Sequence, residues 1–225
     1  GSTLTVNRTV TLDLNGCVLK MTGSDSVIKV EADGDLTIQD RNTTTQHKFN
    51  PHCKYLTWYI DMWELDNGGS EIVSGGVITG GGGDQSNGGG VLVAGGTLVM
   101  AGGSIVGCSA MSRGGGVCNN GTFIMSDGMI KGCTSPDGQY ASGGGVRNSN
   151  QFTMTGGMIG DPDNENDASH VYNTSSQETT LTISGNAKIY TDITNVGILN
   201  ADGGEIAGTM TNDTNRYGNR VGGGD

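Results

Sequence analysis

The sequence has little proline, few aromatic residues and few charges. Of its 225 residues, 3 are proline, while aromatic residues account for 5% and charged residues for 16%. The low proline content excludes a collagen-like chain and a proline-rich linker. The scarcity of large aromatic side chains argues against a conventional globular core built around them. The chain must therefore obtain its stability in another way.

Basic residues and long apolar runs are also scarce. The chain has 12 Lys and Arg residues against 23 Asp and Glu, which gives a formal net charge of −11. Phosphates would be repelled, so we expect no nucleic acid partner. No run approaches the roughly 18 apolar residues of a membrane span, and no signal peptide is visible. Because the chain begins with Gly1 and Ser2, we expect it to be cut from a longer protein with neighbouring domains.

Glycine is the residue in excess, and it punctuates an internal repeat. The chain has 42 glycines, about 19% of its residues against a usual ~7%. Between Gly88 and Ile159 it reads GGGVLVAGGTLVMAGGSIVGC, GGGVCNNGTFIMSDGMIKGC and GGGVRNSNQFTMTGGMIG. Four apolar positions recur at offsets of 25 or 26 and then 29 residues: Val91, Val117 and Val146; Leu98, Phe123 and Phe152; Met100, Met125 and Met154; Ile105, Ile130 and Ile159. Such a period is typical of a solenoid.

Each repeat contains short alternating runs of β-forming residues separated by paired glycines. In TLVM, Leu98 and Met100 point to one face, and Thr97 and Val99 to the other. The glycines suit corners, and each would cost roughly 1 kcal/mol inside a helix. The sequence therefore predicts an all-β fold, a right-handed parallel β-helix of about six to eight coils, 4.8 Å apart, forming one domain over residues 1–225.

The same pattern continues on both sides of the clear repeats. Before them, the expected inward residues are Val27, Val30, Leu36 and Ile38. After them, Val171, Leu181, Ile183 and Ile189 continue the four columns, and a further coil is readable in VGILNADGGEIAG. Cys108 and Cys133 share a column, and their parallel Cβ directions favour stacked thiols over a disulfide.

The segments TLDLNG, VIKV, GDLTIQD and GGVITGG carry a family resemblance. Over roughly residues 3 to 160, the chain resembles the β-helical, adhesin-like surface proteins of gut-dwelling Gram-positive anaerobes. The resemblance implies a parallel β-helix on an extracellular cell surface. It implies little about activity, because members of this group mostly lack an assigned one.

The repeat is interrupted by an aromatic-rich insertion, which we call the arm, at residues 41–67. It contains both tryptophans, and its length is typical of functional loops. In one interpretation, Trp58, Tyr59 and Trp63 bind a glycan or a protein partner. In the other, the arm is a flap whose aromatic residues are buried against the β-helix.

Two places in the sequence raise the question of a metal. His47, His52 and Cys53 lie within the arm, but their spacing is not that of a zinc site. Residues 161–170 form an acidic loop in which Asp161, Asp163, Glu165 and Asp167 alternate, a spacing that can surround a cation such as calcium. The loop lacks the glycine and the distal glutamate of an EF-hand, and a solvated acidic turn is the alternative.

The main enzymatic alternative is a polysaccharide lyase or glycoside hydrolase, because parallel β-helices host such enzymes. A hydrolase needs two carboxylates about 5 to 9.5 Å apart. In the clear repeats, the outward positions carry no carboxylate: they are Thr97, Val99, Thr122, Ile124, Gln151 and Thr153. We therefore expect a non-catalytic adhesin-like module with no catalytic residues. It would bind a host or microbial glycan or surface protein, or act as a stalk for neighbouring domains.

Overall fold

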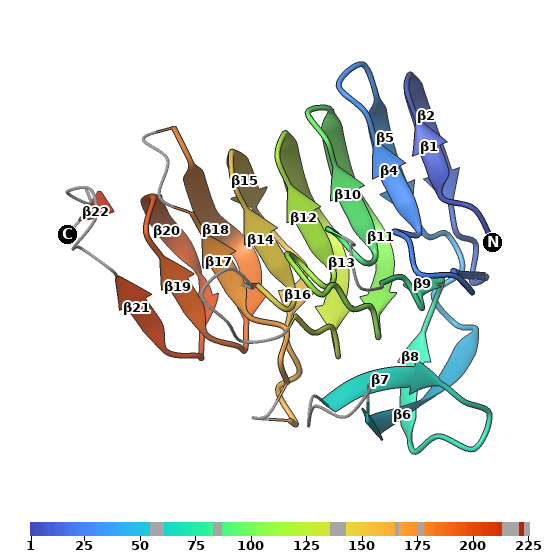
Figure 1. The fold of residues 1–225 in the computed structure, drawn as a ribbon. Helices are drawn as coiled ribbons and strands as arrows, with labels where there is room; N and C mark the ends of the chain where they lie inside the picture. The colour runs from blue at the N-terminus through green and yellow to red at the C-terminus, as the bar shows by residue number, and fades with distance from the viewer. Residues whose placement is uncertain are drawn as a thin grey trace.

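The computed structural model describes residues 1–54, 61–82, 87–135, 143–164, 167–174, 178–212 and 221–222. Within these ranges every regular element is a β-strand (Figure 1). The strands form two long parallel sheets and one small antiparallel sheet. The prediction of an all-β chain with extensive parallel strands is confirmed. No helix in the described ranges is long and apolar enough to span a membrane.

The first long sheet consists of strands of three residues each. Neighbouring strands pair in parallel, and each comes later in the chain than the one before it. In the described part of the chain, the order is β1 (Leu4–Val6), β4 (Ile28–Val30), β10 (Val91–Val93), β12 (Val117–Asn119), β14 (Val146–Asn148), β17 (Val171–Asn173), β19 (Ile193–Asn195) and β21 (Met210–Asn212).

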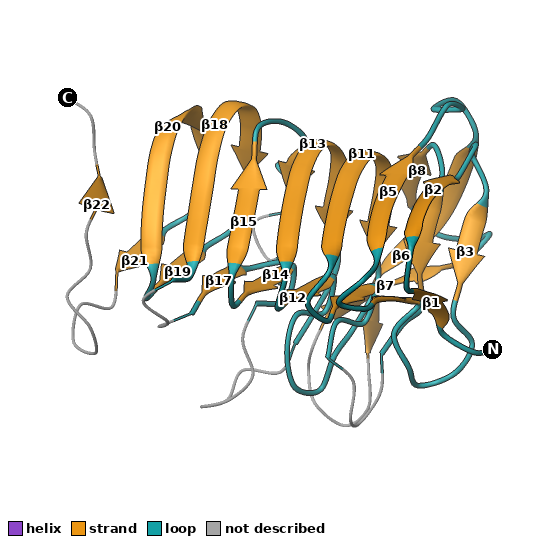
Figure 2. Cartoon of the chain, turned by 90° about the horizontal axis from the view of Figure 1, so that it is seen from above, coloured by secondary structure: helices purple, strands orange, loops and turns teal. Residues whose placement is uncertain are grey.

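The second long sheet contains the longest strands, several of which bend across their middle. Its main path runs through β2 (Thr9–Asp13), β5 (Asp35–Gln39), β11 (Thr97–Val106), β13 (Thr122–Lys131), β15 (Gln151–Met154), β18 (Thr180–Ile189), β20 (Ile198–Ile206) and β22 (Val221–Gly222). The short strands β3 (Val18–Lys20), β9 (Val77–Thr79) and β16 (Met158–Ile159) pair beside this path. Figure 2 shows β2 to β20 of this path side by side in chain order.

The register of the long sheets places like residues on like residues. Val91 pairs with Val117, and Val117 with Val146. The leucine–phenylalanine, methionine and isoleucine columns pair as the sequence predicts, and the later residues Val171, Leu181, Ile183 and Ile189 extend them. A shift of one residue would move every inward side chain to the outer face, so the apolar columns determine the register.

The inward columns form one continuous hydrophobic core. Leu98, Met100, Ile105 and Ile130 are each fully buried. Between neighbouring repeats, the rings of Phe123 and Phe152 stack with centroids 4.5 Å apart and an interplanar angle of 8°. This arrangement builds a core from aliphatic stacks and few aromatic rings, which accounts for the unusual composition.

Glycines allow the long strands to bend and the repeats to lie close together. Gly128 has a φ of +93°, and a Cβ atom there would lie 2.6 Å from the carbonyl oxygen of Gly103 in the repeat below. Near this bend, the pairing of β11 with β13 shifts register between Met100 and Ser104. The bend turns the second half of each strand onto a separate outer face.

A buried row of asparagines, which the sequence analysis missed, runs along the first sheet. Each amide Nδ2 donates to the Oδ1 of the next asparagine at 2.7 to 3.0 Å, in the series Asn119, Asn148, Asn173, Asn195 and Asn212. The first four also donate to backbone carbonyl oxygens, such as that of Gln151. The row satisfies polar groups that would otherwise be costly to bury.

The arm folds into the antiparallel sheet, which consists of β6 (Gln46–Lys54), β7 (Asp61–Leu65) and β8 (Glu71–Ser74) in the order β7-β6-β8. The sequence analysis ended the arm at residue 67, whereas the arm sheet continues through β8 to Ser74. The segment EIVS pairs with β6, and the chain rejoins the long sheets only at β9. Alternation is the same in parallel and antiparallel strands, so periodicity alone does not locate the boundary.

The cysteines of the described region are free. Cys17 is exposed, whereas Cys108, Cys118 and Cys133 are buried. Burial raises the pKa of the Cys133 thiol, and neighbouring Cys108 raises it further. The side chain of Cys53 lies outside the described part of the structure. The prediction of stacked thiols at Cys108 and Cys133 is confirmed.

We expect Asn148→Ala to lower the free energy of unfolding by about 1 to 3 kcal/mol. The change removes the acceptor for Asn119 and the donor to Asn173, and it leaves buried polar atoms without partners. Asn200→Ala on the exposed side of β20 is the matched control and should cost under about 0.5 kcal/mol. Urea denaturation measures both, and equal losses would show that the row does not stabilise the fold.

Candidate functional site

The arm sheet covers an outer face of the second long sheet. Val77 and Val106 lie next to the inward-facing Ile78 and Ile105, so they point outward, yet both are fully buried. They pack in a second hydrophobic cluster with Phe49, Trp63 and Val73 of the arm sheet. Outward-facing apolar residues at these positions require a cover, and the arm sheet provides it.

The root of the arm is closed by one carboxylate. Asp40 accepts a hydrogen bond from the backbone N–H of Gly16 at 2.8 Å and another from that of Gly76 at 2.7 Å. Arg41 pairs with Asp13, and this contact lowers the pKa of the Asp13 carboxyl. The two ends of the insertion are therefore held together on the same repeat.

Trp63 is an anchor of the arm sheet. Its side chain is 2% exposed, and its backbone N–H donates to the carbonyl oxygen of Gly132 at 3.3 Å. A Cβ atom at Gly132 would lie 2.2 Å from the indole, so glycine is needed there for close approach. Trp63 thus has the burial that the flap interpretation requires. Trp58 and Tyr59, the other two predicted ligand-binding residues, lie outside the described residues.

Lys131 joins the arm to the acidic loop. Its Nζ lies 4.2 Å from the centre of a ring of Trp63 and 3.4 Å from Oδ2 of Asp161. The side chains of Lys131 and Asp161 are only 10% and 7% exposed. This buried ion pair was not predicted, although the outward position of Lys131 next to the inward-facing Ile130 was visible in the sequence.

The predicted calcium residues have different surroundings. Asp161 pairs with Lys131 and accepts the backbone N–H of Asp163 at 3.1 Å, while Asp163 is exposed. Asp167 is buried and accepts the N–H groups of Gly132 and Ser169. Glu165 lies outside the described residues. In the ranges that the structure covers, no three His, Cys, Asp or Glu side chains gather as metal ligands, and a four-carboxylate site remains a prediction.

Of the possible zinc ligands in the arm, His47, His52 and Cys53, the structure describes only the side chain of His47. The Nε2 atom of His47 lies 3.0 Å from the carbonyl oxygen of Gly16, so this ring contacts the root of the arm. The side chains of His52 and Cys53 lie outside the part that can be described. His47 has a structural contact that explains its position.

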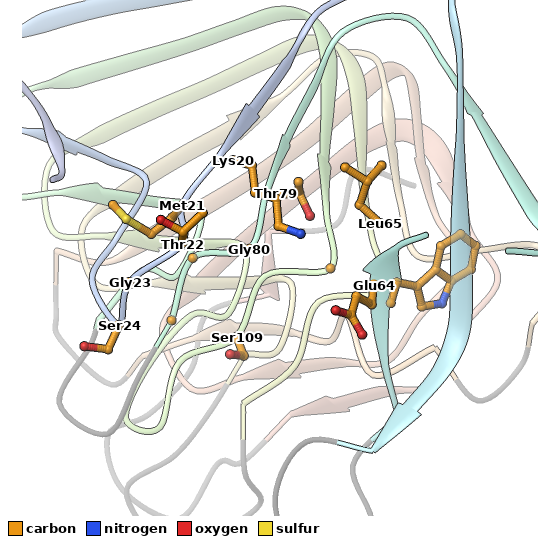
Figure 3. A pocket seen from close by; sticks show the side chains of 14 residues that line it. Lys20, Met21, Thr22, Gly23, Ser24, Glu64, Leu65, Thr79, Gly80 and Ser109 are labelled. Atoms are coloured by element: carbon orange, nitrogen blue, oxygen red, sulfur yellow. The ribbon is translucent and has the colours of Figure 1, made fainter. Parts of the chain in front are cut away.

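A groove of about 540 Å³ opens between the arm sheet and the corners of the first repeats (Figure 3). Its volume is within the usual range for ligand sites. Its chemically informative side chains are Lys20, Met21, Glu64, Leu65, Thr79 and Ser109. Glu64 and Leu65 come from β7, so the arm forms one wall. Lys20 and Thr79 pair in register between β3 and β9, which places them side by side on the opposite wall.

Glycines leave the floor of the groove open. Gly80 and Gly82 both line the groove and have positive φ angles of +73° and +132°. A Cβ atom at Gly82 would lie 2.4 Å from Oγ of Ser109, and one at Gly80 would lie 2.7 Å from the carbonyl oxygen of Met21. Side chains at these positions would occupy the groove and displace its walls.

The described lining of the groove lacks the pair of carboxylates on which glycosidases depend. Among the described residues that line it, Glu64 is the only one with a carboxylate. A glycosidase mechanism requires two carboxyl groups that face each other across the substrate. The lining residues can hold a polar ligand through one cation, one anion and the hydroxyl groups of Thr22, Ser24, Thr79 and Ser109.

The sequence analysis identified Trp63 of this region, but it missed Lys20, Thr79 and Ser109. The available signal was position: Lys20 and Thr79 are outward residues of the two strands that flank the insertion. A scan against protein families, a search of curated proteins and a search of solved structures each found no match for this chain.

We expect Lys131→Met to lower the free energy of unfolding by about 3 to 5 kcal/mol, because it leaves Asp161 buried without its cation. Lys188→Met is the matched control: Lys188 lies 3.9 Å from Glu205, and both side chains are about half exposed. Its loss should be under about 1 kcal/mol. Urea denaturation distinguishes the two, and a small loss at Lys131 would show that the buried pair does not hold the arm.

The pH dependence of stability should reveal the raised pKa of the Asp167 carboxyl. Burial raises the pKa of its carboxyl in the folded state, and hydrogen bonds from Ser169 and Gly132 oppose this shift only in part. The folded state therefore holds the proton more tightly than the unfolded state, and stability is lost as pH rises through the folded pKa. Asp167→Asn removes this pH-dependent contribution to the free energy of unfolding.

The wild type should consequently gain stability relative to Asp167→Asn as the pH falls from about 7 towards about 4. Urea denaturation at a series of pH values measures this difference. Asp163→Asn, on an exposed carboxylate of the same loop, is the control for removing one charge. A difference that moves in the opposite direction contradicts the assignment of a raised pKa to Asp167.

Proposed function

We propose that the chain is a non-catalytic, adhesin-like binding module of an extracellular cell surface. In this proposal the fold is a right-handed parallel β-helix of about six to eight coils. The successive parallel pairing of strands in chain order supports it, as do the continuous inward columns. A solenoid of this kind forms a stiff stalk, because each repeat rests on its neighbours along the whole length.

The observation that carries the binding role is the groove at the root of the arm. The arm sheet is anchored through Phe49 and Trp63, so its β7 wall is held against the β-helix. A pre-formed groove of about 540 Å³ with few convergent polar groups has the form of a ligand site. The partner would be a host or microbial glycan or a surface protein.

A polysaccharide lyase or glycoside hydrolase is the alternative, and the groove favours binding over hydrolysis. A hydrolase would need a second carboxylate facing Glu64, and the described lining residues provide none. The proposal includes no cofactor, and calcium enters only through the acidic-loop hypothesis.

The purified domain should retain at least one member of a panel of immobilised glycans and surface glycoproteins. Glu64→Gln should weaken that retention while leaving the melting temperature unchanged, because Glu64 is exposed on the groove wall. Glu205→Gln, exposed on β20, is the matched control. A blank panel, retention that Glu64→Gln does not change, or release of new reducing ends from the glycans would contradict the proposal.

A further inference from the structure

Two hydroxyl groups open onto the groove from residues that are otherwise buried. The side chains of Thr79 and Ser109 are 2% and 6% exposed, and both residues line the groove. Neither hydroxyl makes a hydrogen bond within the part of the chain that the structure describes, and neither is sealed away from the groove. Both hydroxyls are open to the groove and neither is engaged by the described part of the protein, so each can donate to or accept from a polar ligand there.

The remaining polar groups converge on the same opening. Lys20 lies beside Thr79 in the β3–β9 pairing, and Figure 3 shows Ser109 and Glu64 around the opposite side of the opening. A hydroxyl can both donate and accept, an ammonium only donates, and a carboxylate only accepts. Together these side chains match a ligand that carries several adjacent hydrogen-bond donors and acceptors.

From these observations we propose that the groove binds a neutral saccharide unit, with its ring hydroxyls bonded to Thr79 and Ser109 and bracketed by Lys20 and Glu64. A sugar ring carries adjacent hydroxyls that donate and accept, and its apolar edge can lie against Met21 and Leu65. This inference rests on the proposed binding function, and it names the class of ligand for the groove.

Charge and shape favour a neutral sugar over other ligands. The chain carries a net charge of −11, so an acidic sugar approaches against the field of the whole molecule. A peptide would need either an open strand edge or deep apolar pockets for its side chains. The floor of this groove is instead formed by Gly80, Gly81, Gly82 and Gly107.

The glycine floor adds a separate argument. A side chain at Gly82 would occupy the space in front of the Ser109 hydroxyl. A side chain at Gly107 would meet the backbone oxygen of Trp63 at 2.0 Å and push the arm wall away. The same glycines therefore keep the hydroxyls accessible and the two walls close together.

The test uses methyl glycosides of neutral hexoses and of N-acetylhexosamine, with glucuronate as the anionic comparison. Binding to the isotope-labelled domain is followed by NMR titration. At least one neutral glycoside should bind and should shift the amide signals of Gly80 to Gly82. Thr79→Val and Ser109→Ala should each weaken its affinity about tenfold, since each removes one hydrogen bond to the ligand. Thr37→Val, on the outer face of β5, should leave affinity unchanged.

Deoxy derivatives of the bound sugar give a readout that needs no variant. Removing a ring hydroxyl should weaken binding to the wild type. Binding should not weaken further in the variant, Thr79→Val or Ser109→Ala, that lacks the protein hydroxyl bonded to that ring hydroxyl. This pattern holds even if one variant folds poorly, because the other and the wild type remain measurable.

The outcomes that overturn the inference differ from those that overturn the proposed function. If Thr79→Val, Ser109→Ala and the deoxy sugars all leave saccharide binding unchanged, these two hydroxyls do not bind the sugar. The domain would still be a glycan-binding module. Stronger binding of glucuronate than of any neutral sugar overturns the ligand class. If no glycoside binds while the domain retains a deglycosylated surface protein, the saccharide inference fails and the binding module stands.

Discussion

Parallel pairing of each repeat with the next, in a register that puts like residues on like residues, is the constraint on which the structure depends. The pairing satisfies backbone hydrogen-bonding groups between successive strands, and the matched columns bury the apolar side chains. The register must be kept because inward and outward positions alternate, so a shift of one residue would exchange them. The asparagine row follows the same rule, since each amide finds its partner in the identical position one repeat away.

This constraint applies least to outward positions and corners. Inward positions are occupied by the core, so differences between repeats appear at outward positions and in insertions at corners. The arm is such an insertion, and Asp40 closes its root without disturbing the stacking of the strands around it. Its sheet covers Val77 and Val106, and the groove opens beyond the edge of this covered patch, where the outward residue becomes Thr79.

Much of the fold could be predicted from the sequence because the signal is repeated. The four apolar columns and the stacked thiols follow from aligning three segments, and the structure reproduces each pairing. The end of the arm was misplaced, because EIVS in β8 alternates in the same way as a strand of the parallel sheets. The asparagine row was missed because Asn119 and Asn148 lie next to turns, where asparagine is common for local reasons.

The site was harder to predict for a physical reason. Trp63 was noticed for its residue type, yet the structure shows it as an anchor within the arm. Its contact with Lys131 depends on how an insertion folds back over a repeat some 70 residues later, which no local pattern encodes. Thr79 and Ser109 are ordinary residues in sequence, and only the folded structure brings both to one groove.

The central claim is that the inward columns hold the molecule together, while outward positions away from the arm and the acidic loop are free to vary. Ile130→Ala and Thr153→Ala test it most directly, with urea denaturation as the measurement. Ile130 is fully buried between Ile105 and Ile159, so its truncation should cost about 2 to 5 kcal/mol of unfolding free energy. Thr153 lies on the outer face of β15 and should cost under about 1 kcal/mol. Equal costs, or a larger cost at Thr153, would contradict the account.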